Sequence, residues 1–172
     1  KVSSENIKLE DLTLNSGRIK VKHDGALSLG GGSVDADGEL EIGGESTLNL
    51  EGDLLVAGKV HIHPHAFVNF SGNTLNVSGG RLEIGGEHSF DSITTDATTA
   101  LQVNTYLEMS RTDSGTTPIG DLEIITLEGD TGKHLSLSDM GLAIANAAQL
   151  SGIFLQVSNG ELSLEKGGTF DN

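Results

Sequence analysis

Residues 38–52 read GELEIGGESTLNLEG, and this stretch decides the fold. It holds a glycine, two apolar residues at alternate positions, a short turn, two more alternating apolar residues and a final glycine. Versions of this phrase begin at four glycines, which are spaced by 21, 20 and 22 residues: Gly17, Gly38, Gly58 and Gly80. A repeat of this length with alternating apolar residues is typical of one coil of a β-solenoid.

Alignment of the copies on their glycines gives columns of apolar residues that should face inward. The position two residues after each glycine is taken by Ile19, Leu40, Val60 and Leu82. A third apolar pair precedes each following glycine, at Val34/Ala36, Leu54/Val56 and Leu75/Val77. We therefore expect three short strands per coil, stacked by parallel pairing. An antiparallel sandwich also alternates apolar and polar residues, but it does not require the same columns to recur in every coil.

The sequence thus predicts an all-β protein, a single-stranded right-handed parallel β-helix with about 20–22 residues per coil and a C-terminal cap. Residues 1–92 are expected to form regular coils. Residues 93–172 are expected to form degenerate coils and the cap of the same continuous domain. Near the end we expect a short helix within residues 138–150, where apolar residues fall at helical spacing, and a hairpin at Asn159-Gly160.

Outward-facing positions carry charges that alternate from coil to coil. One residue after each glycine stand Arg18, Glu39, Lys59 and Arg81. Three residues after each glycine stand Lys20, Glu41, His61 and Glu83. If the coils stack in register, Glu39 lies between two cations on adjacent coils.

The composition excludes several classes of function. The chain has 25 acidic and 10 basic residues, a net charge of −15, so it has no basic surface to displace counterions from nucleic acid. It has no cysteine, which excludes thiol catalysis and disulfides. No stretch approaches the length of a membrane-spanning helix. The chain begins at Lys1, and we expect a mature product or an excised fragment.

Three stretches resemble a known family. Residues 38–52 are similar to the passenger repeats of bacterial autotransporters, and residues 121–129 and 154–164 resemble the last part of such passengers. The resemblance implies a right-handed β-helix that is secreted or displayed on the outer surface of a Gram-negative bacterium. It implies no catalytic residue. We therefore expect a secreted or cell-surface module with a structural or adhesive role, whose partner is a protein or glycoprotein surface.

Two tripeptides carry the sharpest chemical signal, Asp113-Ser-Gly and Asp130-Thr-Gly. Asp-Ser/Thr-Gly is the signature of aspartic proteases, in which two carboxylates share one proton and activate a water. The same residue types also form ordinary turns. The aspartic-protease family has apolar strand residues before the Asp, whereas here the two copies are preceded by Arg111-Thr112 and Glu128-Gly129. The alternative function is an exported aspartic-type endopeptidase that degrades a mucin-like host glycoprotein through Asp113 and Asp130. The sequence favours the non-enzymatic role.

A histidine cluster, HIHPH at residues 61–65, follows the third glycine. His61 and His63 should share the outer face, and Glu41 and Glu83 should flank His61 on the neighbouring coils. Imidazole and carboxylate groups at this spacing can hold Zn²⁺ or another divalent cation. A solvated or pH-sensitive surface is the alternative interpretation. No other cofactor is expected.

Overall fold

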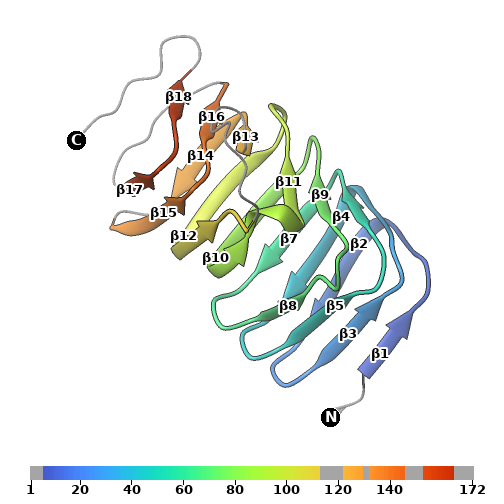
Figure 1. Cartoon of the computed structure of the whole chain (residues 1–172). Helices are drawn as coiled ribbons and strands as arrows, with labels where there is room; N and C mark the ends of the chain where they lie inside the picture. The colour runs from blue at the N-terminus through green and yellow to red at the C-terminus, as the bar shows by residue number, and fades with distance from the viewer. Residues whose placement is uncertain (1–5, 113–121, 130–131, 146–152, 165–172) are drawn as a thin grey trace.

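The computed structural model describes residues 6–112, 122–129, 132–145 and 153–164 (Figure 1). These residues form a β-solenoid of about seven turns with no α-helix; a single 3₁₀ turn, η1, spans Phe90–Ser92. Every strand pair within the described ranges is parallel. The prediction of a stacked parallel β-helix is therefore confirmed, and the antiparallel sandwich is excluded.

Equivalent strands of successive coils stack into three sheets. The first sheet consists of β1 (Asn6–Leu9), β3 (Ala26–Leu29), β5 (Thr47–Leu50) and β8 (Phe67–Asn69). A larger sheet bends around a corner of the coil, because β2 (Leu12–Val21) and β4 (Gly32–Ile42) run through the bend. One arm of this sheet holds β6 (Leu54–Val56), β9 (Leu75–Val77) and β11 (Ile93–Thr95). The other arm holds β7 (Lys59–Ile62), β10 (Arg81–Ser89), β12 (Ala100–Ser110), β14 (Thr126–Gly129), β15 (Lys133–Ser138) and β17 (Ile153–Ser158).

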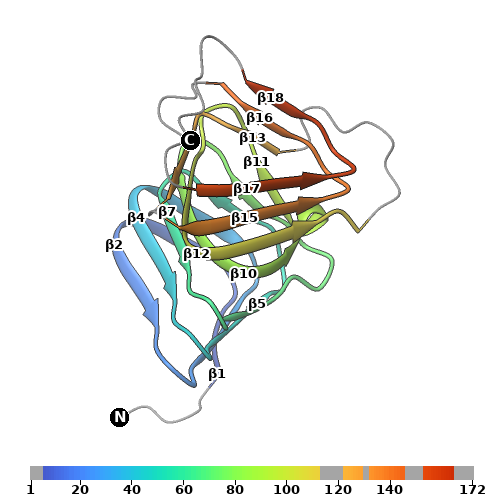
Figure 2. The same cartoon turned by 90° about the vertical axis from the view of Figure 1, so that its left-hand side faces the viewer.

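A third sheet continues the stack toward the C-terminal end. It consists of β13 (Leu122–Ile124), β16 (Leu142–Ile144) and β18 (Leu162–Leu164). Figure 2 shows this sheet beyond β11, while β15 lies next to β12 and β17 lies next to β15. The last described strands thus add coils to the same stack.

The core is built from the predicted columns of aliphatic side chains. Ile19, Leu40, Val60 and Leu82 occupy matching register positions on successive strands, and Leu101 and Leu127 extend the column. All of them except the partly buried Ile19 are almost completely buried. Burial of one such side chain contributes about 1.5–3 kcal/mol, so the columns drive the coiling.

One predicted column is shifted. Val34 lies opposite Val56, Gly32 lies opposite Leu54, and Ala36 is exposed, so the prediction of Val34/Ala36 as an inward pair is wrong. The physical reason is the spacing to the following glycine. Val34 lies four residues before Gly38, whereas Val56 lies two residues before Gly58. The two extra residues carry β4 around the corner.

Residues 138–145 form the end of β15, a turn and β16, so the helix predicted within residues 138–150 is wrong where the structure describes it; residues 146–152 lie outside the described residues. Met140, Leu142 and Ile144 are buried at alternate positions. Met140 and Ile144 are four residues apart, which fits both a helical period and a strand period. Pairing of β16 with β13 and β18 decides for the strand.

The hairpin predicted at Asn159-Gly160 is also wrong, because β17 pairs with β15 and β18 pairs with β16, both in parallel. Asn159 has φ 56° and Asp139 has φ 58°, and the Asn159 amide donates a 3.0 Å hydrogen bond to Asp139 Oδ1. A Cβ at Gly160 would lie 1.8 Å from the carbonyl oxygen of Met140. Asn159-Gly160 therefore forms a corner in which Asn159 has a left-handed backbone conformation. This corner is stacked closely on the corner of the preceding coil, where Asp139 has the same conformation.

A carboxylate organises the corner between β11 and β12. Asp96 accepts hydrogen bonds from the Ser78 hydroxyl at 2.5 Å, the Thr98 hydroxyl at 2.6 Å and the Thr98 backbone N–H at 2.9 Å. The hydrogen bond from Ser78, followed by those from Thr98, lowers the pKa of Asp96 to about 2. Ser78 belongs to the preceding coil, so this carboxylate holds two coils together.

We expect Asp96→Asn to lower the free energy of unfolding by about 1–2 kcal/mol at pH 7, a value reduced for the partial exposure of the carboxylate. Because the folded pKa lies below the unfolded value of 3.8, this stabilisation is present above pH 3.8 and is lost as the pH falls through about 2. Urea unfolding of both proteins at pH 7, 4 and 3 measures the difference.

The exposed carboxylate of Asp37 provides the control for that measurement. Asp37→Asn changes the net charge equally and should leave the unfolding free energy within about 0.5 kcal/mol. A difference between wild type and Asp96→Asn that stays constant from pH 7 to pH 3 would contradict the assigned role of the Asp96 carboxylate.

Candidate functional site

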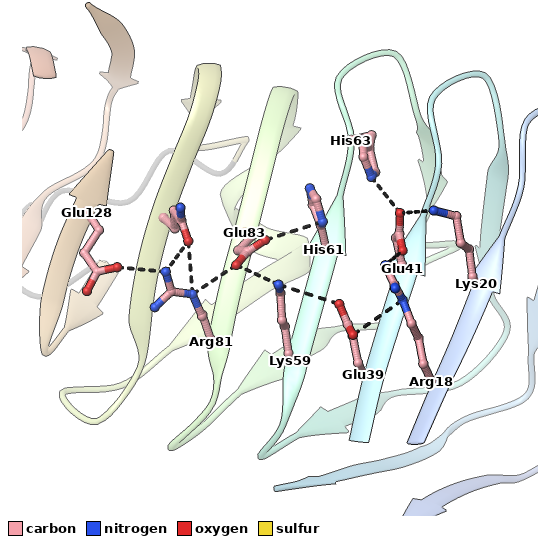
Figure 3. A network of polar contacts seen from close by, with 11 residues as sticks. Arg18, Lys20, Glu39, Glu41, Lys59, His61, His63, Arg81, Glu83 and Glu128 are labelled. Atoms are coloured by element: carbon pink, nitrogen blue, oxygen red, sulfur yellow. Dashed lines mark hydrogen bonds and ion pairs between the residues drawn. The ribbon is translucent and has the colours of Figure 1, made fainter. Parts of the chain in front are cut away.

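The outer surface of the arm formed by β2, β4, β7, β10, β12 and β14 carries a continuous network of polar side chains (Figure 3). We call this network the charge ladder. It consists of Arg18, Lys20, Glu39, Glu41, Lys59, His61, His63, Arg81, Glu83, Gln102 and Glu128. It exists because the inward positions of these strands are apolar and parallel pairing in register brings the outward positions of neighbouring coils side by side.

Glu39 lies between two cations, as the sequence predicts. Its carboxylate is 3.4 Å from Arg18 Nε on one side and 3.6 Å from Lys59 Nζ on the other. All three side chains are partly exposed. Exposed pairs of this kind contribute about 0–1 kcal/mol each, so they favour the register more than they add to stability.

Glu41 is the most deeply buried charge of the ladder, since its side chain is only 3% exposed. Lys20 Nζ donates a 2.6 Å hydrogen bond to Glu41 Oε1, and the Arg18 guanidinium pairs with Oε2. His63 Nε2 lies 3.0 Å from Oε1. A carboxylate at this depth needs such partners, because an unpaired buried charge would cost several kcal/mol.

The rings of His61 and His63 stack with their centroids 4.0 Å apart and an angle of 19° between their planes. Burial, followed by the neighbouring His63, lowers the pKa of His61. Burial, followed by the cations Lys20 and Arg18, lowers the pKa of His63. Both imidazoles are therefore mainly neutral at pH 7 and have nitrogen lone pairs available.

Glu83 lies on the far side of His61. Its Oε2 is 3.4 Å from His61 Nδ1. Its Oε1 is 2.8 Å from Lys59 Nζ and 3.0 Å from Arg81 Nε. Burial alone would raise the pKa of Glu83, but the hydrogen bonds from Lys59 and Arg81 outweigh it and lower the pKa. Glu83 is thus ionised at neutral pH. On its other side, the Arg81 guanidinium donates a hydrogen bond to Gln102 Oε1 and lies 2.8 Å from Glu128 Oε2, so the network extends to β12 and β14.

Of the four residues predicted as metal ligands, the structure brings together Glu41, His61 and His63 but leaves Glu83 outside the group. One donor atom each from Glu41, His61 and His63 lies within 4.8 Å of the others. Glu83 contacts His61 from the opposite side (Figure 3). The coil-to-coil spacing of the sequence indicated the neighbours of His61, but it did not indicate that Arg18 and Lys20 both reach Glu41.

Sequence reasoning missed a second group, which lies in the turns that follow β2 and β4. It consists of His23, Asp24 and Glu45. All three are exposed, and His23 Nε2 is 3.0 Å from Glu45 Oε2. The signal was present in the sequence, because His23 and Glu45 are 22 residues apart, the length of one coil.

The surface between these two groups is hollowed. The hollow has a volume of about 460 Å³ and opens broadly to solvent. Lys20, Lys22, His23, Glu41, His63 and His65 contribute to its wall. Glu41 and His63 are therefore accessible to small ions from this side.

Asp113 and Asp130, the predicted carboxylate pair, lie outside the described residues. Their role as catalytic residues stays a prediction.

Comparison with known proteins yields no family assignment: no family model, no curated protein and no solved structure matches this chain. The resemblance to autotransporter passengers accordingly stays a prediction. Within the described residues, no helix has the length and apolar character needed to cross a membrane.

Proposed function

We propose that this chain is a rigid structural or adhesive module of a protein exported to the surface of a Gram-negative bacterium. The charge ladder is the face that it presents to a protein or glycoprotein partner. The β-solenoid fold supports a long, regular display surface, and the similarity of residues 38–52 to autotransporter passenger repeats supports export.

The observation that carries this proposal is the balance of charge on the ladder. Four cations and four carboxylates pair along it, and both its histidines are mainly neutral, so the net charge of −15 is carried by the rest of the chain. A partner that approaches the ladder meets no net repulsion there. The side chains are already held in place by their pairs, so docking on them costs little conformational entropy.

A matched pair of double variants tests the proposed binding face. Lys59→Ser/Arg81→Ser removes two cations from the ladder, and Lys8→Ser/Lys133→Ser removes two cations from β1 and β15. We expect wild type and the control to bind a mucin-coated sensor surface alike, and the ladder variant to bind at least tenfold more weakly. Circular dichroism confirms that both variants are folded.

The same experiment separates the adhesive role from the peptidase alternative. Under the adhesive proposal the mucin is recovered intact. Equal binding by both double variants would contradict the ladder as the docking face. Mucin cleavage that is lost in Asp113→Asn or Asp130→Asn would establish the aspartic-type endopeptidase instead.

A further inference from the structure

We infer that Glu41, His61 and His63 form a binding site for one divalent transition-metal ion of the Zn²⁺ class. This goes beyond the proposed display function, because a module can dock on a partner without any metal.

Register and strand alternation create the site. Glu41 on β4 is the direct register neighbour of His61 on β7, and His63 lies two residues further along the chain, on the same side. The donor atoms of the three residues already lie within 4.8 Å of one another. Tetrahedral Zn²⁺ with bonds of about 2.0–2.2 Å needs donor atoms roughly 3.4 Å apart. The stacked rings of His61 and His63 have to turn out of their nearly parallel arrangement before a nitrogen of each can face the same ion. Rotation about the side-chain bonds of the two histidines provides this movement.

The chemistry of the donor set selects the ion. Two imidazoles and one carboxylate suit Zn²⁺, Co²⁺, Ni²⁺ or Cu²⁺, whereas Ca²⁺ and Mg²⁺ require mainly oxygen ligands. The broad hollow beside Glu41 and His63 leaves room for water as the fourth ligand.

Glu83 has a separate task at this site. It contacts His61 Nδ1 at 3.4 Å and so leaves Nε2 of the same ring for the metal. A carboxylate behind a metal-bound imidazole fixes the orientation of the ring and raises its basicity. Of the four residues that the sequence suggested as ligands, three bind and the fourth orients.

Lys20 competes with the metal. Its ammonium group lies 2.6 Å from Glu41 Oε1, the oxygen that also faces His63. An incoming dication has to displace this ammonium, and the 44% exposed Lys20 side chain can turn into solvent. The nearby charges of Arg18 and Lys59 also oppose the ion, while Glu39 and Glu83 favour it. Removal of Lys20 should therefore tighten binding, an effect that metal bound elsewhere on the surface would not show.

Titration of the complete, tag-free chain with ZnCl₂ in a calorimeter tests the site. We expect His63→Gln and Glu41→Gln each to weaken Zn²⁺ binding at least tenfold, and Lys20→Ala to strengthen it several-fold. His23→Gln removes the histidine of the exposed neighbouring group and should leave the affinity unchanged. Co²⁺ added in place of Zn²⁺ should give the visible absorption of a tetrahedral site in wild type and lose it in His63→Gln.

Each outcome decides the matter. Absence of Zn²⁺ binding in both wild type and Lys20→Ala would overturn the inference. So would an affinity that is unchanged in His63→Gln but lost in His23→Gln, because the ion would then lie at the exposed group. An unchanged affinity in Lys20→Ala would also overturn it, since the ion would not touch Glu41 Oε1. Circular dichroism melts confirm that each variant is folded.

Discussion

Gly58→Ala is expected to destabilise the fold by at least about 3 kcal/mol, although it adds a single methyl group. A Cβ at Gly58 would lie 2.2 Å from the carbonyl oxygen of Asp35 and 2.3 Å from that of Gly38, both on the coil below. Backbone oxygens cannot move away as a flexible side chain can. The coils would have to separate, and the 2.9 Å hydrogen bond from Arg81 N–H to the Gly58 carbonyl would be strained.

Gly44→Ala is the matched control. The nearest atom to a Cβ at Gly44 is also a backbone oxygen, that of Pro64, but it lies 3.2 Å away instead of the 2.2 Å found at Gly58. The backbone at Gly44 therefore has to give by only a few tenths of an ångström. We expect a loss of less than about 1 kcal/mol. Denaturant midpoints followed by circular dichroism compare the variants. Equal midpoints for Gly58→Ala and wild type would show that the coils are not stacked as closely as the structure has them.

The repeated glycine explains why the regular half of the fold could be predicted from the sequence. Gly38, Gly58 and Gly80 stand at one corner, and a Cβ at Gly80 would lie 2.3 Å from the Gly58 carbonyl oxygen. The same steric demand therefore recurs in these three successive coils and leaves glycine at a fixed spacing. The inward columns follow by alternation, and the position of Glu39 between Arg18 and Lys59 follows from the register.

The C-terminal part could not be predicted in the same way, because its local patterns fit two structures. Residues 138–145 satisfy a helical and a strand period, and Asn159-Gly160 suits a hairpin turn and a left-handed corner. The choice is made by strands far away in sequence, β13 for β16 and β15 for β17. Nonlocal pairing overrides local preference here.

The candidate metal site was partly predictable for a related reason. One coil length places Glu41 and Glu83 on either side of His61, and backbone register alone gives this order. Backbone register does not say how far a long side chain reaches. Lys20 and Arg18 cross to Glu41, and Glu83 turns toward Lys59 and Arg81. The sequence therefore could not predict that three of the residues are placed as ligands and that Glu83 is placed to orient His61, because this depends on where the side chains lie.

Leu54→Ala is expected to lower the free energy of unfolding by about 2–5 kcal/mol, because it leaves a cavity in the column between Gly32 and Leu75. Leu54 is completely buried, whereas Leu55, the next residue on β6, is 49% exposed on the outer surface. Leu55→Ala removes the same atoms and should cost less than about 1 kcal/mol.

Because the two leucines are adjacent on β6, the strand propensity and the chemical change are the same in both variants. Only the side of the sheet differs, so the difference between the two unfolding free energies measures the alternation that defines a coil. Urea unfolding of the two variants in parallel gives that difference. Similar losses for Leu54→Ala and Leu55→Ala would mean that β6 does not separate an interior from an exterior, and the stacked aliphatic columns could not then be the source of stability.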